Sequence, residues 1–295
     1  MKRPAYVGRF APSPTGPLHR GSLVAAVASF LDARAHGGHW LLRIEDIDPP
    51  REIPGAADTI IRQLETHGLL WDGAISHQSR HGQRYQSALD QLARAGLLYD
   101  CGCNRQRLAT LHGRYDGACR PHRYGPGAPI TGALRLRTQA GLPPGASRDF
   151  MLGVVHGDPA SDGDFIVRRR DGLIAYQLAV AVDDAAQGIT HVLRGIDLLD
   201  STPRQQFILH CLQLPVPVYG HIPLVLDAEG RKLSKQNRAP ALTTAAARAN
   251  VHWALSWLGL RPPADLQAQA PRDQLAWGIA HWARERVAHR TNREE

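Results

Sequence analysis

The segment Gly8–Ser22, GRFAPSPTGPLHRGS, constrains this chain more than any other stretch. An apolar strand start runs into a turn rich in proline and glycine, and a helix then begins around His19 and Gly21. A helix N-terminus offers unpaired N–H groups and the positive end of a dipole, which favours a phosphate group. Small residues let the backbone approach the anion, and the His19 imidazole adds a side-chain donor. We therefore predict a phosphate-binding turn here.

Strand and helix patterns alternate along the rest of the first hundred residues. The predicted strands cover 5–10 and 40–44. A buried helix is predicted over 18–36, and two more helices around Ile60–Leu64 and Tyr85–Leu92. Gly68 and Gly96 are the predicted ends of the last two helices. The alternation resumes with the apolar run 173–182, a strand over 191–194 and a helix opened by Ser201-Thr202-Pro203. Such alternation favours a parallel sheet covered by helices, an α/β fold.

Four regions are predicted along the chain. They are the first half of an α/β core over 1–96, an insertion over 97–172, the second half of the core over 173–240, and a helical region over 241–295. The insertion contains a cysteine cluster, a loop rich in glycine and proline, and short strand-like pieces such as 133–137. In the last region Leu275, Ile279 and Trp282 share one face, and the arginines near the end are Arg284, Arg286, Arg290 and Arg293.

The composition is that of a globular protein with a polyanionic partner. Hydrophobic residues make up 43% of the 295 residues and charged residues 21%, which excludes a disordered chain. No apolar run reaches the roughly 18 residues that a membrane span needs. Met1–Pro4 leave no room for a signal peptide before the turn, so we expect a cytoplasmic protein. The net charge of +8 favours nucleic acid as a partner, although many basic proteins bind none.

Three of the four cysteines lie close together, at Cys101, Cys103 and Cys119. In a reducing compartment such a cluster favours a metal over a disulfide framework, and structural zinc takes four ligands of this kind. The candidates for the fourth ligand are His112, Tyr115 and His122. Histidine is chemically the better ligand, because a phenol must lose a proton of pKa about 10. Free thiols are the alternative, and Cys211 is expected to be a buried helix residue without chemistry.

A second signature lies at Arg231–Gln236, RKLSKQ, which follows a glycine. Together with His19-x-Gly21 it resembles the HIGH and KMSKS signatures of class I aminoacyl-tRNA synthetases. In adenylate formation, negative charge builds on the phosphoryl oxygens and the leaving pyrophosphate, so positioning and cationic groups dominate catalysis. Lys235 would close over the triphosphate as that charge develops, and Lys232 would assist. Alone, a basic loop of this kind is more often a solvated surface.

Further residues extend the resemblance to the glutamyl-tRNA synthetase group. They are the run Gly8–Gly16 and the segment Leu42–Asp48 with Arg51. The resemblance implies a Rossmann-type class I core that forms an adenylate from glutamate and ATP, with Mg²⁺ accompanying the ATP. Ser22 stands where HIGH has its second histidine, and Gln236 stands where KMSKS has its last serine; a hydroxyl at Ser22 still offers hydrogen bonds to a nucleotide.

The resemblance also implies the roles of single residues. The implied catalytic residues are His19, Gly21 and Lys235. The implied ATP-binding residues are His19, Gly21, Ser22, Lys232 and Lys235. Glutamate binding falls to Arg9, Phe10, Ala11, Pro12, Ser13, Glu45, Tyr176 and Arg194. Arginine forks suit the side-chain carboxylate, and Glu45 suits the α-ammonium group. The implied metal ligands are Cys101, Cys103, Tyr115 and Cys119, holding one structural zinc ion. Structurally, Tyr176 could instead belong to the core, and Arg194 could pair with Asp197.

About 60 residues follow Lys235, whereas enzymes that charge tRNA with glutamate carry a large anticodon-binding region there. This shortened architecture resembles the glutamyl-Q tRNA(Asp) synthetases. That resemblance implies activation of glutamate without tRNA and transfer to the queuosine base at the wobble position of tRNA(Asp). The insertion and the terminal arginines are then expected to contact the anticodon stem-loop, and the protein is expected to be a monomer. The alternatives are a truncated glutamyl-tRNA synthetase that charges a 3′ end, a non-catalytic RNA-binding paralogue, and a small-molecule nucleotidyltransferase.

Overall fold

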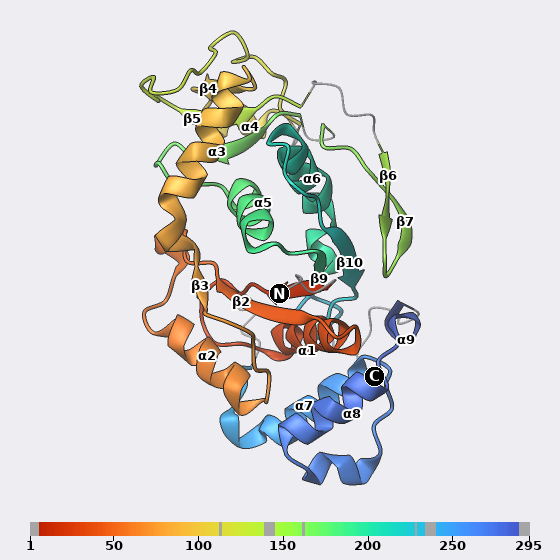
Figure 1. Ribbon diagram of the computed structural model, residues 1–295. Coiled ribbons are helices and arrows are strands. Elements are labelled where there is room, and N and C mark those ends of the chain that lie inside the picture. The colour runs from red at the N-terminus through yellow and green to blue at the C-terminus, as the bar shows by residue number, and fades with distance from the viewer. Residues whose placement is uncertain are drawn as a thin grey trace.

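The computed structural model describes residues 6–111, 114–138, 145–160, 163–227, 229–233 and 240–288. In Figure 1 the α/β body occupies the middle of the molecule, the insertion lies at one end and the C-terminal helices lie at the other. Within the described residues, no helix is both long enough and apolar enough to pass through a bilayer.

Three parallel strands form the sheet of the first half, in the order β1-β2-β3. The elements are β1 Val7–Phe10, α1 Arg20–Ala35, β2 His39–Ile44, α2 Ala56–Thr66, β3 Ser76–His77 and α3 Gly82–Arg94. The strands and helices predicted for this half are confirmed, and ten of the sixteen residues of α1 are buried. Gly68 and Gly96 follow α2 and α3 with φ of +76° and +69°, a left-handed conformation that glycine adopts without strain.

Two more parallel strands, β9 (His191–Gly195) and β10 (Val218–Ile222), form the sheet of the second half. This sheet lies beside the first, and the Thr190 amide donates to the Val7 carbonyl at 2.9 Å. The helices are α5 Tyr176–Gln187 and α6 Thr202–Cys211. Most of the apolar run 173–182 is therefore helix, and Tyr176 is the first residue of α5.

The insertion has sheets of its own, and their pairing is antiparallel. Strands β4 (Leu98–Cys101), β5 (Ala133–Leu136) and β8 (Phe165–Arg168) pair in that order, and the short helix α4 (Arg105–Ala109) follows β4. Strands β6 (Gly145–Asp149) and β7 (Gly153–Gly157) form a hairpin. The hairpin reaches back to the core, where the Phe150 amide donates to the Tyr219 carbonyl of β10 at 2.9 Å.

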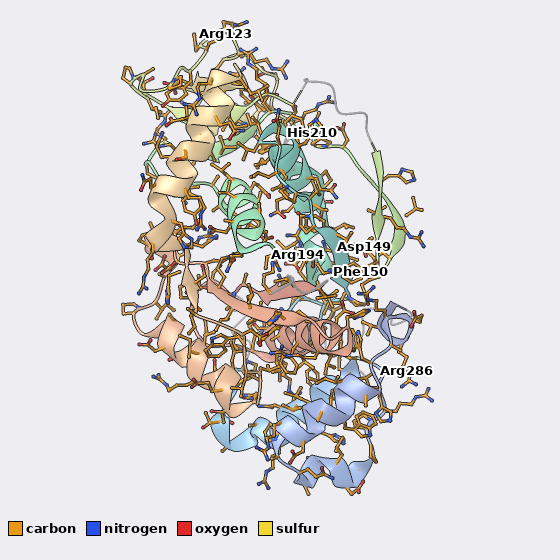
Figure 2. The ribbon with its side chains drawn as sticks, in the orientation of Figure 1. Arg123, Asp149, Phe150, Arg194, His210 and Arg286 are labelled. Atoms are coloured by element: carbon orange, nitrogen blue, oxygen red, sulfur yellow. The ribbon has the colours of Figure 1, made fainter. Side chains whose placement is uncertain are left out.

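The C-terminal helices α7 (Ala247–Trp257), α8 (Pro271–Ala280) and α9 (Arg284–Ala288) pack against α1. A buried carboxylate on α1 anchors their end. Asp32 accepts hydrogen bonds from Trp282 Nε1 at 2.8 Å and from Arg284 Nε at 2.7 Å. Arg284, which we expected to face RNA, is therefore used inside the protein, whereas Arg286 is exposed (Figure 2). Arg290 and Arg293 lie outside the described residues.

Candidate active site

The turn between β1 and α1 leads into a capped helix N-terminus, as predicted. His19 is the N-cap of α1, and its Nδ1 accepts a hydrogen bond from the Ser22 amide at 3.2 Å. Because Nδ1 accepts, the proton of the neutral ring is on Nε2. The turn is held from α2, where the side-chain amide of Gln63 accepts from the Leu18 amide at 2.7 Å and donates to the Leu242 carbonyl at 2.8 Å.

A cavity of about 470 Å³, here called the larger cavity, opens in front of this helix N-terminus. Its wall includes eight of the predicted site residues: Phe10, Ala11, Pro12, Ser13, His19, Gly21, Ser22 and Lys232. Residues of the second half close the other side, among them Gly195, Asp197 and Ile222. The larger cavity therefore joins both halves of the core at the carboxyl ends of their strands, where open α/β sheets bind ligands.

The start of the basic signature is a tight hairpin at the mouth of the larger cavity. The Leu233 amide donates to the Val225 carbonyl at 2.9 Å, and the Asp227 amide donates to the Arg231 carbonyl at 2.8 Å. In this hairpin the Lys232 ammonium group forms an ion pair with the Asp197 carboxylate. Lys235 lies outside the described residues.

A second cavity of about 360 Å³, here called the smaller cavity, adjoins the first. Ser13 and Thr15 line both. Glu45 at the end of β2 and Tyr176 at the start of α5 line the smaller cavity only, together with charged residues such as Arg169. Tyr176 therefore lies in a cavity wall, where a role in glutamate binding would place it, and not in the core alone.

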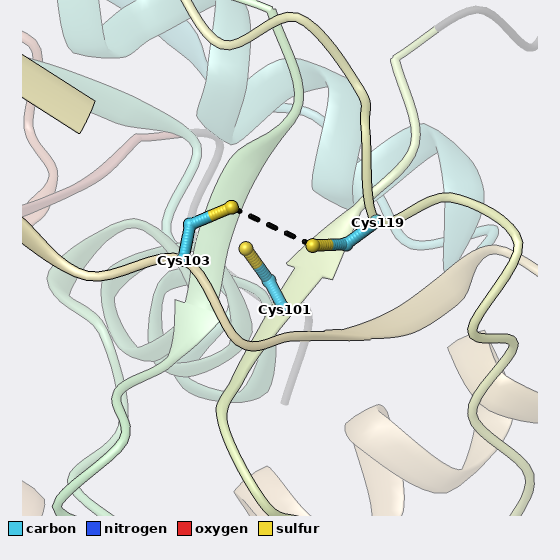
Figure 3. Close-up of side chains that lie close together, drawn as sticks. All are labelled: Cys101, Cys103 and Cys119. Atoms are coloured by element: carbon cyan, nitrogen blue, oxygen red, sulfur yellow. Dashed lines mark hydrogen bonds between the residues drawn. The ribbon is translucent and has the colours of Figure 1, made fainter. Parts of the chain in front are cut away.

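Three cysteine sulfurs of the insertion converge (Figure 3), and the phenol of Tyr115 lies beside them. The Sγ atoms of Cys101, Cys103 and Cys119 all lie within 4.8 Å of one another. Tyr115 Oη lies 3.4 Å from Cys101 Sγ and 3.8 Å from Cys103 Sγ. In the described part of the chain this group contains no histidine. Of the other candidates for the fourth ligand, His122 is exposed and His112 lies outside the described residues.

Two arginines face the sulfurs. Arg107 Nη1 lies 3.2 Å from Cys103 Sγ, and Arg135 Nε lies 3.4 Å from Cys101 Sγ. Burial acts to raise the pKa of Cys101, but hydrogen bonds from Tyr115, the Cys103 amide and Arg135 lower it overall. The cluster therefore favours the thiolate form of Cys101, which is the form that binds metals.

Comparison with known proteins gives the family. A family model described as tRNA synthetases class I (E and Q), catalytic domain, matches residues 6–252. The glutamyl-Q tRNA(Asp) synthetase of Serratia proteamaculans is 51% identical over 98% of this chain and 94% of its own length. The protein of the same name from Thiobacillus denitrificans is 50% identical over 97% of this chain and 96% of its own length. The chain belongs to the glutamyl-Q tRNA(Asp) synthetase family.

Membership makes the protein a ligase with a class I aminoacyl-tRNA synthetase catalytic domain, and such synthetases use ATP and Mg²⁺. The fold agrees. A glutamate-tRNA synthetase from Elizabethkingia anophelis superimposes with a TM-score of 0.79 at 23% identity, covering 98% of this chain and 68% of the other. The predicted α/β class I fold is thereby confirmed.

In this synthetase a buried ionic network lies behind the smaller cavity. Asp184 of α5 accepts from Arg9 Nε at 3.2 Å and from Arg43 Nη1 at 2.7 Å, and Arg43 Nη2 donates to Glu45 at 3.3 Å. Burial acts to raise the pKa of Asp184, but Arg9 and Arg43 outweigh it and lower that pKa. Burial raises the pKa of Glu45 although Arg43 and Arg9 oppose it.

The network explains where Arg9 lies and identifies residues that sequence reasoning missed. Arg9 is buried, and its Nε and Nη2 both face Asp184 rather than a cavity wall. Arg43 and Asp184 were not predicted. A charged residue inside the apolar strand sequence WLLRI was the available signal for Arg43, whereas nothing in the sequence linked it to Asp184, 141 positions away.

Arg194 is held more completely than expected. Its Nε donates to His221, its Nη1 to Gln205 at 2.8 Å, and its Nη2 to both Thr202 at 2.9 Å and the Leu198 carbonyl at 3.2 Å. A guanidinium group has five N–H donors, and within the described part of the chain four of them have protein partners, so one donor on Nη1 remains for a ligand. A two-pronged fork from Arg194 alone is therefore excluded while these bonds hold. Pairing with Asp197 is also wrong, because Asp197 pairs with Lys232.

Proposed function

We propose that this synthetase activates L-glutamate with ATP and transfers it to the queuosine base in the anticodon of tRNA(Asp). The observation that carries the proposal is the pair of cavities that share Ser13 and Thr15. ATP in the larger cavity and glutamate in the smaller one would bring the α-phosphate and the α-carboxylate together at that shared wall. The names of the relatives support the choice of tRNA.

The reaction has two balanced steps. A carboxylate oxygen of glutamate attacks the α-phosphorus of ATP, the bond to the β-phosphate oxygen breaks, and pyrophosphate leaves. A hydroxyl of the modified base then attacks the carbonyl carbon of the adenylate, loses its proton, and AMP leaves. His19, the Gly21 amide and the Ser22 hydroxyl would bind phosphate oxygens, and Lys232 and Lys235 would neutralise the leaving pyrophosphate. Mg²⁺ bound with ATP would supply further charge neutralisation.

Selection of glutamate would use both sides of the smaller cavity. Glu45 would receive the α-ammonium group, and the α-carboxylate would lie at the wall that the two cavities share, against Ser13 and the larger-cavity residues Phe10–Pro12. Tyr176 and the remaining Nη1 donor of Arg194 would bind the side-chain carboxylate, with Arg9 supplying charge from behind. Burial raises the pKa of Tyr176, and Glu45 raises it further, so the hydroxyl keeps its proton and remains a donor.

Replacing Gly21 by alanine is expected to lower kcat/KM for ATP by about 10-fold to 100-fold without loss of stability. The added Cβ would lie 3.1 Å from two atoms of the His19 ring and 3.5 Å from the Leu233 carbonyl oxygen, so the ring must shift. Alanine favours helix, so the melting temperature should hold or rise. Pyrophosphate exchange and calorimetry check both parts. Gly82→Ala on α3, where a Cβ meets open space, is the matched control. Unchanged kinetics in G21A would contradict the role of His19.

We also propose that Cys101, Cys103, Cys119 and Tyr115 hold a structural zinc ion. Three sulfurs within 4.8 Å of one another and a phenol oxygen beside two of them form a four-ligand set of the kind that zinc prefers. A bound cation lowers the pKa of its ligands and so favours the phenolate of Tyr115. The zinc would shape the insertion and take no part in catalysis.

The insertion would then present RNA-binding arginines. Arg105, Arg114 and Arg123, all near the cysteines in the chain, are exposed, and Figure 2 labels Arg123. We infer the division into the regions 1–96, 97–172, 173–240 and 241–295, because the antiparallel sheet of the insertion interrupts two parallel sheets. Since its substrate tRNA is a cytoplasmic molecule in bacteria, we place the activity in the cytoplasm.

Transfer of labelled glutamate should require queuosine. We expect incorporation into tRNA(Asp) that carries queuosine and none above background into the same tRNA carrying guanosine. Nuclease mapping should place the label in the anticodon loop. Equal transfer to both tRNAs would overturn the proposal, and label at the 3′ end would instead identify a truncated glutamyl-tRNA synthetase. Glutamate-dependent pyrophosphate exchange without tRNA tests activation separately, and its absence would favour an RNA-binding paralogue.

A further inference from the structure

A buried imidazole lies between Arg194 and a second buried carboxylate. Arg194 and His221 stand opposite each other on β9 and β10, and both are almost fully buried. Arg194 Nε donates to His221 Nε2 at 3.1 Å. On the other side of the ring, His221 Nδ1 lies 2.5 Å from Asp149 Oδ2. Asp149, at the end of β6, therefore reaches Arg194 through one histidine (Figure 2).

The partners of His221 determine where its proton is. Arginine is only a donor, so Nε2 of His221 must accept and cannot carry a proton. Nδ1 must then carry it and donate to the Asp149 carboxylate, which only accepts. Burial lowers the pKa of His221, Asp149 opposes this, and Arg194 reinforces it. The imidazole is therefore neutral and in the Nδ1–H tautomer.

Asp149 is itself fixed by the backbone. Its Oδ1 accepts from the Met151 amide at 2.8 Å, the Leu152 amide at 2.9 Å and the His221 amide at 3.3 Å. These bonds leave Oδ2 for the imidazole. Burial acts to raise the pKa of Asp149, but the hydrogen bonds from His221 and from these amides lower it overall. The hairpin β6–β7 thus presents a rigid carboxylate to the ring.

We propose that His221, fixed by Asp149 as the Nδ1–H tautomer, is a positioning residue that aims Arg194 at the side-chain carboxylate of glutamate. The inference rests on the proposed function, in which Arg194 binds that carboxylate. Arg194 has one N–H left for a ligand, so a rotation of the guanidinium that released Nε would redirect that donor. His221 Nε2 prevents this rotation because it accepts the hydrogen bond from Nε. It thereby holds the edge of the guanidinium group that lies opposite the proposed ligand.

Two substitutions of His221 separate its contact with Asp149 from its contact with Arg194, whose partner Thr202 also lies 3.2 Å from Nε2 through Oγ1. Asparagine places its amide nitrogen near the position of Nδ1, so His221→Asn keeps a donor to Asp149 and loses the acceptor for Arg194. Glutamine places its amide oxygen near the position of Nε2, so His221→Gln keeps the acceptor for Arg194. We expect H221N to raise KM for glutamate by about 10-fold to 100-fold and H221Q by about 3-fold or less. In both, kcat and KM for ATP should change by less than about 3-fold, because Arg194 is a substrate-binding residue.

Asp149→Asn tests the tautomer. The amide oxygen of the new side chain must stay on the three backbone amides that now bind Oδ1, so its NH₂ group faces His221 Nδ1. That nitrogen must then accept, and the ring proton moves to Nε2. Nε2–H can donate to Thr202 Oγ1, 3.2 Å away, but it opposes the Nε–H of Arg194, which loses its acceptor. D149N should therefore raise KM for glutamate as much as H221N does. Nitrogen-15 NMR should show His221 as Nδ1–H in the wild type and Nε2–H in D149N.

The measurements are glutamate-dependent pyrophosphate exchange, NMR and thermal melting on the full chain. Tyr99→Phe is the control for loss of a buried hydrogen bond elsewhere, since Tyr99 Oη donates to Asp164 at 2.7 Å within the insertion. Equal KM values in H221N and the wild type, or a larger loss in H221Q than in H221N, would overturn the proposal. A wild type without glutamate-dependent exchange would overturn the proposed function. In that case the NMR measurement of the tautomer would test the role of His221 by itself. An Nε2–H tautomer in the wild type would overturn that role.

Discussion

Replacing Asp184 by asparagine is expected to lower the free energy of unfolding by about 3–5 kcal/mol. Asp184 is fully buried, and its carboxylate faces two buried guanidinium groups, Arg9 at 3.2 Å and Arg43 at 2.7 Å. Asparagine keeps the shape and removes the negative charge. Arg43 would then keep Glu45 and the side-chain oxygen of Gln187 as partners, and Arg9 would lose its carboxylate in the described part of the network. Urea unfolding followed by tryptophan fluorescence measures the loss.

The same variant tests how the stability that Asp184 contributes depends on pH. The pKa of Asp184 lies below its ordinary value of 3.8, because Arg9 and Arg43 outweigh the effect of burial. A group whose pKa is lowered by folding contributes stability that is present above the unfolded pKa and is lost as the pH falls through the folded pKa. The difference between wild type and D184N should therefore be constant at neutral pH and shrink below pH 3.8.

Asp171→Asn is the matched control for this experiment. Asp171 forms an ion pair with Arg169 at 2.6 Å, but the two side chains are 47% and 40% exposed to solvent. Solvent screens such a pair, so its removal should leave the urea midpoint unchanged. A D184N variant as stable as the wild type would show that the Arg9–Asp184–Arg43 network does not stabilise the fold.

Replacing Cys119 by serine is expected to abolish zinc binding and transfer to tRNA while leaving glutamate activation largely intact. The cluster around Tyr99, Cys101 and Tyr115 is small, so the metal would supply much of the energy that folds this part of the insertion. None of the four proposed ligands lines the larger or the smaller cavity as described. Zinc content should fall from one ion per chain to below about 0.1, because three ligands hold structural zinc far more weakly than four.

Three measurements check this prediction. Metal analysis gives the zinc content, trypsin digestion reports unfolding around Arg105 and Arg114, and the two half-reactions are assayed separately. Cys211→Ala is the control, because burial raises the pKa of the Cys211 thiol to about 11 and it lies outside the cluster. Retention of one zinc ion by C119S would contradict the ligand set. Loss of pyrophosphate exchange would contradict a purely structural role.

The local parts of the site could be predicted from sequence. The capped N-terminus at His19, the glycine stops after α2 and α3, and the grouping of the three cysteines depend on residues close together in the chain. Local backbone chemistry decides such features, so a pattern of residue types is sufficient evidence. The fourth ligand could not be chosen in this way from His112, Tyr115 and His122, because the choice depends on how the chain around the cysteines folds.

Contacts across the fold could not be predicted. Arg43 meets Asp184 across 141 positions, and Asp149 meets His221 across 72. Buried charges must find partners wherever packing brings them, and sequence spacing carries no information about those partners. The same limit applies to Arg284. It lies in an arginine-rich tail, which suggests RNA binding, but its guanidinium group pairs with the buried Asp32 carboxylate.

The sequence by itself determined the turn from Gly8 to Ser22 that leads into α1, the α/β order of the elements and the cysteine cluster, because each depends on neighbouring residues. Only the tertiary structure decided how the arginines are used. Arg9 and Arg194 were both predicted as carboxylate forks, but Asp184 takes two nitrogens of Arg9, and four of the five donors of Arg194 bond within the protein. Long-range packing decides which donors remain for a ligand, because a buried guanidinium first satisfies its hydrogen bonds inside the fold.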